Sequence, residues 1–342
     1  MTAPETLPAT GREWHLTARP HGWPTPEDFA LREAPVAEPG EGEILVRNLH
    51  FSVDPYMRGR MNDVKSYVPP FQLDRPMDGA AVGVVLASRH PDVSVGDHVQ
   101  HGLGWREFAT LDGGRATRVS AELAPLPAYL GVLGMPGLTA YAGLLRVGSL
   151  QQGDRVFVSG AAGAVGSEVG QIARLKGASQ VIGSAGSDEK VRLLTEKYGF
   201  HTAFNYKSAS VGEQLKEAAP DGIDLYFDNV GGDHLEAAIA RLNTHGRAVI
   251  CGMIAQYNAT EPPAAPRNLA LVIGKRLRLQ GMLVADHTDL QQQFVEEVSG
   301  WIRSGELVYD ETVVEGIDQA VDAFLGMLAG RNTGKMIVSL PQ

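Results

Sequence analysis

The chain has 342 residues and a formal net charge of −10 at pH 7. This length favours two domains over one, and the negative charge argues against a nucleic-acid or anionic-membrane partner. No apolar run approaches the roughly 18 residues that a transmembrane helix needs, and the first residues lack the basic and apolar segments of a secretory signal. We therefore expect a cytoplasmic protein whose partner is a small molecule, with no nucleic-acid and no membrane partner.

The sequence contains one cysteine, Cys251. It can form no intrachain disulfide, which fits a reducing compartment. A four-cysteine structural zinc site is impossible for the same reason.

Residues 43–117 are predicted to form a compact, mostly β domain. Short runs with strand character, at 43–47, 80–86 and 98–100, are separated by glycine and proline turns.

After Pro136 the pattern alternates between apolar runs and helical periods. This alternation is typical of an α/β fold with a doubly wound parallel sheet and helices on both faces. The predicted strands are 155–159, 180–184, 203–206, 223–229, 248–251 and 277–280, and the predicted helices include 188–198, 211–219 and 234–242. A helix over 317–328 and a strand over 335–340 end the chain.

A cluster of small residues follows the predicted strand 155–159 and opens a helical pattern. Small residues at such a turn let the backbone approach a pyrophosphate, whose charge is then stabilised by the free N–H groups at the helix start. Against the pattern G-x-G-x-x-G, the first glycine position is occupied by Ala161, while the other two hold glycine. The candidate pyrophosphate-binding residues are Ala161, Gly163, Ala164, Val165 and Gly166.

Four further segments occur in order along the chain: VDPYMRGRM at 53–61, GSAGSDEK at 183–190, DNVGG at 228–232 and CGMIAQYN at 251–258. With the glycine turn and the order of the domains, they resemble the zinc-independent medium-chain dehydrogenase/reductases. Within that superfamily the chain is similar to the NADPH-dependent alkenal/one double-bond reductases, which include prostaglandin, leukotriene and curcumin reductases.

The resemblance implies three parts. A GroES-like, mostly β catalytic domain would cover residues 1–131, and a Rossmann NADP-binding domain would cover residues 132–298. Residues 299–342 would return to the catalytic domain.

The sequence also bears on which nucleotide is bound. An NAD site carries an Asp or Glu about 20 residues beyond the glycines, but this chain has Gly186 there, and the carboxylates just after it fit a helix start. Lys190 is either a solvated helix residue or a point charge for a 2′-phosphate. The resemblance assigns Lys190 the second role, with Tyr206 nearby, so we expect NADPH rather than NADH.

Other candidate residues follow predicted strands, at the edge where an open α/β sheet binds its ligands. Asn229 is either a turn residue or a cofactor ligand, and the resemblance favours the second. Cys251 is expected to be a small apolar residue lining the cofactor, not a nucleophile. Asn332 matches the family's second asparagine near the nicotinamide, with a turn residue as the alternative.

No metal is expected. Zinc-dependent members of the superfamily carry Gly-His-Glu where this chain has Met-Asp-Gly at 77–79. His98 and His101 are three residues apart on a predicted strand, so their side chains point to opposite faces.

The expected chemistry is addition of hydride to the β-carbon of an α,β-unsaturated aldehyde or ketone. Direct carbonyl reduction would lack a Lewis acid, whereas hydride addition to an enone delocalises charge into an enolate. Tyr257, just past a strand end, is the candidate donor to the oxygen where that charge develops. The resemblance pairs it with the nicotinamide ribose and makes Tyr56 a second catalytic candidate. Both tyrosines could instead be packing residues.

Two alternative functions stay open: an NADPH quinone oxidoreductase, and a catalytically silent NADPH-binding or structural protein. A homodimer is expected, because the apolar segment 277–284 would otherwise leave an exposed sheet edge.

Overall fold

The computed structural model describes residues 7–341, so residues 1–6 and residue 342 lie outside the described part. Contacts divide the chain into two compact units. The first comprises Met1–Leu130, Thr312–Arg331 and Met336–Gln342, and the second comprises Gly131–Glu311 and Asn332–Lys335.

The boundary that we expected after residue 298 falls inside helix α8 (Gln291–Ser304). The helix continues because Phe294 and Val298, one turn apart, are both buried on the same face.

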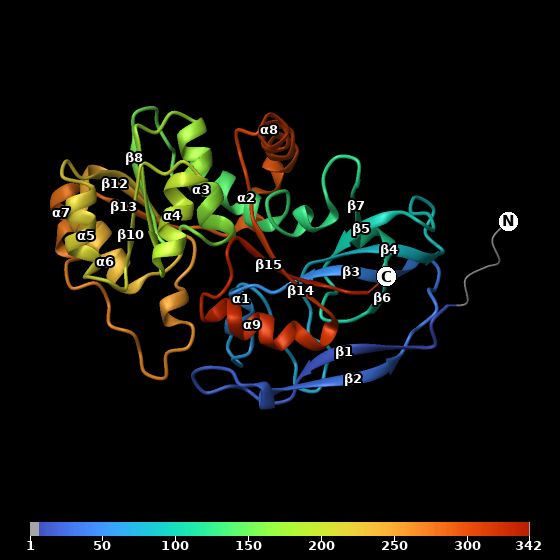
Figure 1. The fold of residues 1–342 in the computed structure, drawn as a ribbon. Helices are drawn as coiled ribbons and strands as arrows, with labels where there is room; N and C mark the ends of the chain where they lie inside the picture. The colour runs from blue at the N-terminus through green and yellow to red at the C-terminus, as the bar shows by residue number, and fades with distance from the viewer. Residues whose placement is uncertain (1–6, 342) are drawn as a thin grey trace. The chain divides into compact units, whose positions relative to one another are not determined.

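The first unit is built on an antiparallel sheet (Figure 1). Over the described residues its strand order is β14-β15-β3-β4-β5-β7, with β6 paired to β3. These strands are β3 (Glu43–Ser52), β4 (Ala81–Ser88), β5 (His98–His101), β6 (Phe108–Asp112), β7 (Thr117–Arg118), β14 (Glu311–Glu315) and β15 (Lys335–Ser339). Among its described residues the unit has two α-helices, α1 (Tyr56–Arg60) and α9 (Ala320–Leu328). The core includes Phe51, Trp105 and Phe324, each fully buried.

A separate hairpin-like pair in this unit, β1 (Thr10–Leu16) with β2 (Phe29–Pro35), was not expected from the sequence. Neither strand is a continuous apolar run, and their antiparallel register joins residues separated by a long connection. The pair packs through partly buried side chains, Trp14 and Leu31, against the core of the unit.

The second unit confirms the expected doubly wound α/β fold. Its described residues form a six-stranded parallel sheet in the order β10-β9-β8-β11-β12-β13. The strands are β8 (Arg155–Val158), β9 (Gln180–Ala185), β10 (Thr202–Asn205), β11 (Ile223–Asp228), β12 (Leu242–Ile250) and β13 (Arg278–Gly281). The helices are α2 (Met135–Ala142), α3 (Ala164–Leu175), α4 (Asp188–Glu196), α5 (Val211–Ala218), α6 (Gly232–Arg241), α7 (Ala270–Lys275) and α8.

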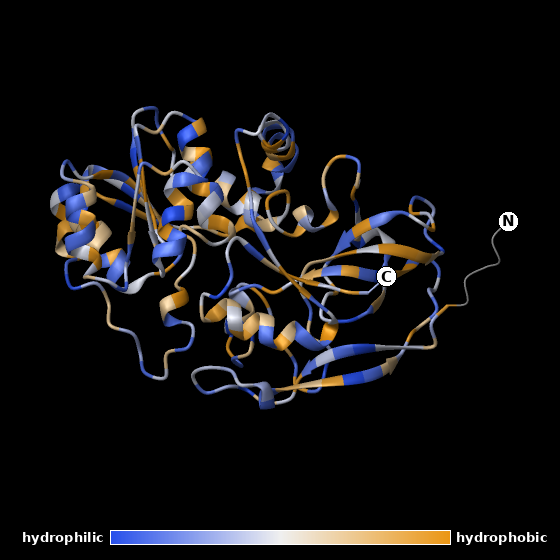
Figure 2. Ribbon diagram, viewed as in Figure 1, coloured by the Kyte–Doolittle hydropathy of each residue, from blue (hydrophilic) through white to orange (hydrophobic). Residues whose placement is uncertain are grey.

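Helices cover both faces of this sheet, with α3 and α4 on one side and α5, α6 and α7 on the other (Figure 1). Figure 2 shows mixed hydrophobic and hydrophilic positions along these helices. This mixture is typical of helices that pack one side on a sheet. The ring of Phe157 stacks on Tyr226 at 5.1 Å and on Phe204 at 5.8 Å, which ties the centre of the sheet to the α5–α6 side.

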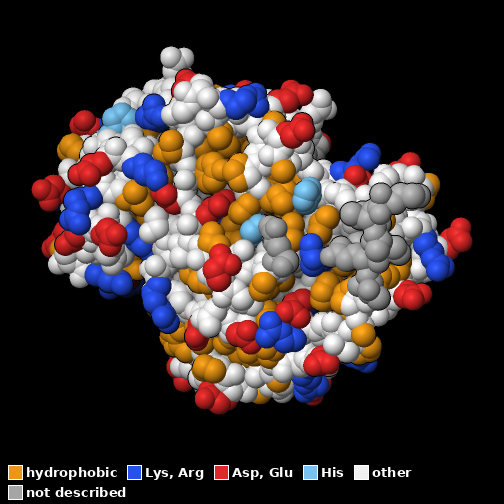
Figure 3. Space-filling view, turned by 45° about the vertical axis from the view of Figure 1, so that its right-hand side comes forward, with side chains coloured by type: hydrophobic (Ala, Val, Ile, Leu, Met, Phe, Trp, Pro, Cys, Tyr) orange, Lys and Arg blue, Asp and Glu red, His pale blue; other side chains and the backbone are white. Residues whose placement is uncertain are grey.

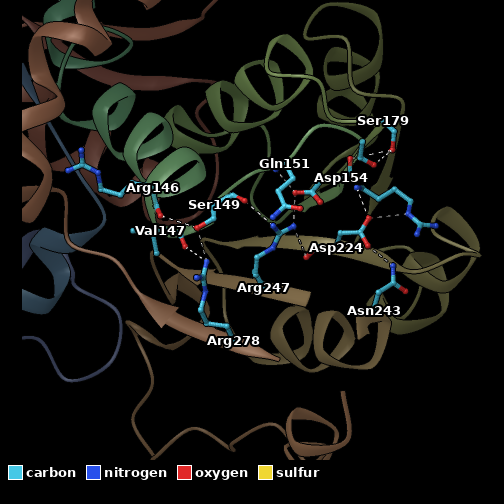
Figure 4. A network of polar contacts seen from close by, with 12 residues as sticks. Arg146, Val147, Ser149, Gln151, Asp154, Ser179, Asp224, Asn243, Arg247 and Arg278 are labelled. Atoms are coloured by element: carbon cyan, nitrogen blue, oxygen red, sulfur yellow. Dashed lines mark hydrogen bonds and ion pairs between the residues drawn. The ribbon is translucent and has the colours of Figure 1, made fainter. Parts of the chain in front are cut away.

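A polar network lies at the amino ends of the parallel strands (Figure 4). The nearly buried Arg247 guanidinium donates to Asp154 over 2.6 Å and to the carbonyl oxygen of Ser149 over 2.9 Å. Asp154 also accepts from the backbone N–H of Gln151, so one carboxylate joins the turn before β8 to strand β12. Because parallel strands share one direction, this network is at the opposite edge of the sheet from the ligand-binding edge.

None of the helices in the described part of the chain is long and apolar enough to cross a membrane. On the face drawn in Figure 3, lysine and arginine side chains are interspersed with aspartate and glutamate.

Candidate functional site

The glycine turn joins β8 to α3 with little space between the backbone segments. A Cβ placed on Gly166 would lie 2.4 Å from the carbonyl oxygen of Gly160, so the helix start packs directly on the turn. Gly163 caps the helix, and Gly160 has a φ of +58°, a conformation that favours glycine. Sequence reasoning missed Gly160, although it stands directly before Ala161.

These residues fit the pyrophosphate of a dinucleotide. A Cβ on Gly163 would meet only one atom within 4 Å, the carbonyl oxygen of Gly160, so the outer side of the turn is open. The first N–H groups of α3, including those of Ala164 and Val165, have no partner within the helix. Together they form an anion-binding helix start beside an open turn.

A second group of polar residues gathers beyond β9, around Gly186. A Cβ on Gly186 would lie 3.0 Å from the hydroxyl oxygen of Tyr206 and 3.4 Å from Cε of Lys207. The pKa of Lys190 is lowered by burial first and then by the positive charge of Lys207, while the Glu189 carboxylate opposes the shift. The structure therefore brings together Gly186, Tyr206 and Lys190, and it adds Lys207, which sequence reasoning missed.

The end of β11 is held by a buried carboxylate. One oxygen of Asp228 accepts from Tyr226 over 2.7 Å, from Ser159 over 3.2 Å and from the backbone N–H of Gly231 over 2.8 Å. Burial raises the pKa of Asp228, and these hydrogen bonds oppose that shift. Asn229 donates its side-chain amide to the carbonyl oxygen of Ser159 over 2.8 Å. The Asn229 amide is thus fixed in orientation, which its position after a strand did not reveal.

The hydroxyl group of Tyr257 lies at the same edge of the sheet. It accepts from the backbone N–H of Met253 over 3.4 Å. A Cβ on Gly252 would lie 3.4 Å from this hydroxyl and 3.4 Å from the carbonyl oxygen of Asn229. Tyr257 and Asn229 therefore flank Gly252, just past the carboxyl ends of β11 and β12.

Cys251 and Asn332 occupy two further places at this edge. The backbone N–H of Cys251 donates to the backbone carbonyl oxygen of Asp228, and burial raises the pKa of the Cys251 thiol to about 12. Its thiol therefore stays protonated at neutral pH, which does not suit a nucleophile. Asn332 donates to the carbonyl oxygen of Gly334 over 2.7 Å, and Gly334 in turn donates to Ala162 of the glycine turn. Both alternatives for Asn332, a turn residue and a neighbour of the cofactor, thus fit its position.

In the first unit, Tyr56 begins α1 and lines an open cavity of about 390 Å³. Other residues of the lining are Arg60, Val68, Asp78, Gln100 and His101. Burial, followed by the negative charge of Asp54, raises the pKa of Tyr56, so its hydroxyl group remains a donor at neutral pH.

Two charged side chains of the lining act on Tyr56, Arg60 and Asp78, and they are paired with each other; the third charged residue of the lining is Arg115. Arg60 pairs with Asp78, with one N–O distance of 3.0 Å, and its guanidinium lies 4.0 Å from the centre of the Phe71 ring. Burial lowers the pKa of His101 to about 4, so its imidazole is neutral near pH 7. Tyr56 is then a neutral donor among paired charges, which suits an uncharged ligand oxygen.

Among residues 7–341, no group of three or more His, Cys, Asp or Glu side chains could hold a metal ion. Met77 is fully buried in the core, and Asp78 pairs with Arg60.

Comparison with known proteins places this geometry in a family. Residues 12–119 match the family described as the N-terminal domain of oxidoreductase, and residues 164–300 match the family described as zinc-binding dehydrogenase. The NADPH-dependent curcumin reductase of Escherichia coli is 42% identical over 332 residues, covering 96% of each chain. The NADP⁺-dependent 2-alkenal reductase of Nicotiana tabacum is 42% identical over 323 residues, covering 93% of this chain and 94% of the tobacco protein.

A solved structure agrees with these relatives. The crystal structure of CurA from Vibrio vulnificus in complex with NADPH superposes with a TM-score of 0.93 at 42% identity, covering 97% of this chain and 99% of CurA. The fold and the glycine turn define a dinucleotide-binding oxidoreductase. The chain belongs to the medium-chain dehydrogenase/reductase superfamily, in the branch that contains the NADPH-dependent alkenal and enone double-bond reductases.

Proposed function

We propose that this chain reduces the carbon–carbon double bond of α,β-unsaturated aldehydes or ketones, with NADPH as the cofactor. The observation that carries the proposal is the position of the Tyr257 hydroxyl beside Gly252 and Asn229. This is the edge at which open α/β sheets bind their ligands. The activities after which the curcumin and 2-alkenal reductases are named support the same reaction.

When bound, NADPH supplies a hydride for the β-carbon of the substrate. Tyr257 donates a hydrogen bond to the carbonyl oxygen, where negative charge develops as the enolate forms. A proton taken up at the α-carbon then gives the saturated product. Tyr56, which lines the cavity of the first unit, is the second catalytic candidate, because its protonated hydroxyl suits a carbonyl oxygen.

The cofactor is held by residues of the second unit in this proposal. The glycine turn binds the pyrophosphate, Asn229, Cys251 and Asn332 line the nicotinamide end, and Lys190 with Tyr206 binds the 2′-phosphate. The pyrophosphate-binding residues are Ala161, Gly163, Ala164, Val165 and Gly166.

Replacing Lys190 with alanine is expected to raise the dissociation constant of NADPH about 10-fold, because a partly buried cation near the phosphate is lost. The dissociation constant of NADH should change little, since NADH lacks that phosphate. Fluorescence titration with both nucleotides measures the two constants. An equal rise in the dissociation constants of NADPH and NADH would show that Lys190 does not bind the 2′-phosphate.

The reaction is tested against the quinone alternative by comparing kcat/KM for a linear enal and for a benzoquinone with NADPH. The proposal predicts the higher value for the enal. A higher value for the quinone would favour the quinone oxidoreductase, and NADPH binding without turnover of either would favour a silent protein.

We further propose a homodimer that pairs through β13, which stands at one edge of the parallel sheet. Apolar side chains in the segments that precede and follow β13 in sequence are exposed: Ile273 by 81%, Leu269 by 48% and Leu283 by 40%. Exposed strand edges with apolar neighbours favour pairing with a second copy.

Sedimentation at micromolar concentration is therefore expected to give twice the chain mass. Replacing Ile273 with lysine should shift the protein toward the monomer, because a buried lysine in the interface would lack a partner. Replacing Val313, which is 42% exposed in the first unit, with lysine is the matched control. A monomeric wild-type protein would contradict the proposal.

For location we propose a reducing, cytoplasmic compartment. The sequence has one cysteine, which can form no intrachain disulfide and therefore fits a reducing compartment.

A further inference from the structure

We propose that Lys207 is a second cation of the 2′-phosphate site and that Asn205 positions it. The inference rests on the proposed use of NADPH and extends its phosphate site beyond Lys190 and Tyr206.

The path of the Lys207 side chain is the first observation. Its Cε lies 3.4 Å from the position of a Cβ on Gly186, next to the hydroxyl of Tyr206, so the aliphatic stem crosses the backbone of Gly186. Its Nζ lies 5.9 Å from the centre of the Tyr206 ring. The ammonium group is therefore directed to the region that holds Tyr206, although Lys207 is an exposed residue.

The charge balance is the second observation. Lys190 and Lys207 are close enough for the charge of Lys207 to lower the pKa of Lys190. Lys207 forms no ion pair with a carboxylate among residues 7–341, and the Glu189 carboxylate offsets only part of the repulsion between the two ammonium groups. A phosphate carries the charge and the acceptor oxygens that two ammonium groups can share.

Asn205 explains why Lys207 takes this path. The side-chain oxygen of Asn205 accepts from the backbone N–H of Lys207 over 3.0 Å, which closes a tight turn after β10. The side-chain nitrogen of Asn205 donates to Asp188 over 2.7 Å. The Asn205 amide thus fixes the turn that carries Lys207 over Gly186 and also holds the Asp188 carboxylate, which would repel a phosphate.

The test measures binding by calorimetry with NADPH, NADH and 2′-AMP. Lys207→Met keeps an apolar stem over Gly186 and removes the charge, and Lys216→Met, at an exposed position on α5, is the matched control. We expect Lys207→Met to weaken the binding of NADPH and 2′-AMP about 5- to 10-fold and to leave the binding of NADH nearly unchanged. The affinity of the variant for NADPH should also depend less on salt between about 0.05 and 0.5 M.

Asn205→Ala provides a second variant that retains the lysine. It should weaken the binding of NADPH more than that of NADH. The substitution removes the hydrogen bond that closes the turn before Lys207 and the hydrogen bond to the Asp188 carboxylate. Near-ultraviolet circular dichroism and the unfolding temperature show whether each variant keeps the native fold.

Equal weakening of NADPH and NADH by Lys207→Met, or no weakening at all, would overturn the role of Lys207. If Lys190→Ala still weakens NADPH selectively in that case, the proposed cofactor site stands and only Lys207 is removed from it. If neither substitution weakens the binding of NADPH more than that of NADH, the proposed 2′-phosphate site is wrong as well.

Discussion

Replacing Tyr257 with phenylalanine is expected to lower kcat for an enone about 100-fold, because the hydrogen bond to the developing enolate oxygen is lost. The dissociation constant of NADPH should stay close to that of the wild type, since the ring and its place beside Gly252 are retained. Stopped-flow measurement of single turnovers, with separate titration of NADPH, divides the effect between chemistry and binding.

Tyr309→Phe is the matched control, because Tyr309 is a partly buried tyrosine of the same unit that the proposed site does not use. Its turnover should equal that of the wild type. Full turnover of Tyr257→Phe would show that the hydroxyl group makes no contribution to the chemical step.

The second large effect is expected on stability. Asp154→Ala should lower the free energy of unfolding by about 3 kcal/mol, because it leaves the charge of Arg247 nearly buried and without its carboxylate. The variant also loses the hydrogen bond from Gln151 that closes the turn before β8. Urea unfolding followed by circular dichroism measures the difference.

An exposed ion pair provides the comparison. Asp221 is 87% exposed and lies 3.9 Å from Arg155, so Asp221→Ala should change the free energy of unfolding by less than about 1 kcal/mol. Equal effects of the two substitutions would show that the network in Figure 4 is not a main source of stability.

Much of the nucleotide-binding unit could be predicted from sequence because its signals are local. Each buried parallel strand is a short apolar run, and each helix has an apolar stripe, so β8, β9, α4 and β11 were found within a few residues of their bounds. Strand β12 begins at Leu242, well before the predicted residue 248. The prediction missed the first half of the strand because that half contains polar residues.

The missed features depend on contacts between distant residues. The β1–β2 pair has no continuous apolar run. Lys207 lies near Gly186 only because β10 pairs with β9, so its place at the proposed site depends on that pairing. The buried hydrogen bonds of Asp228 likewise join β11 to Ser159 at the end of β8. A pattern along one segment contains no information on such pairings.

The central claim is tested most directly by product analysis of the reaction of NADPH with 3-nonen-2-one. NADPH oxidation is followed by absorbance, and the products are separated and identified by mass spectrometry. The proposal predicts the saturated ketone, with one hydride equivalent used for each molecule formed. The allylic alcohol as the product would contradict it, because hydride would then have been added to the carbonyl carbon and not to the β-carbon.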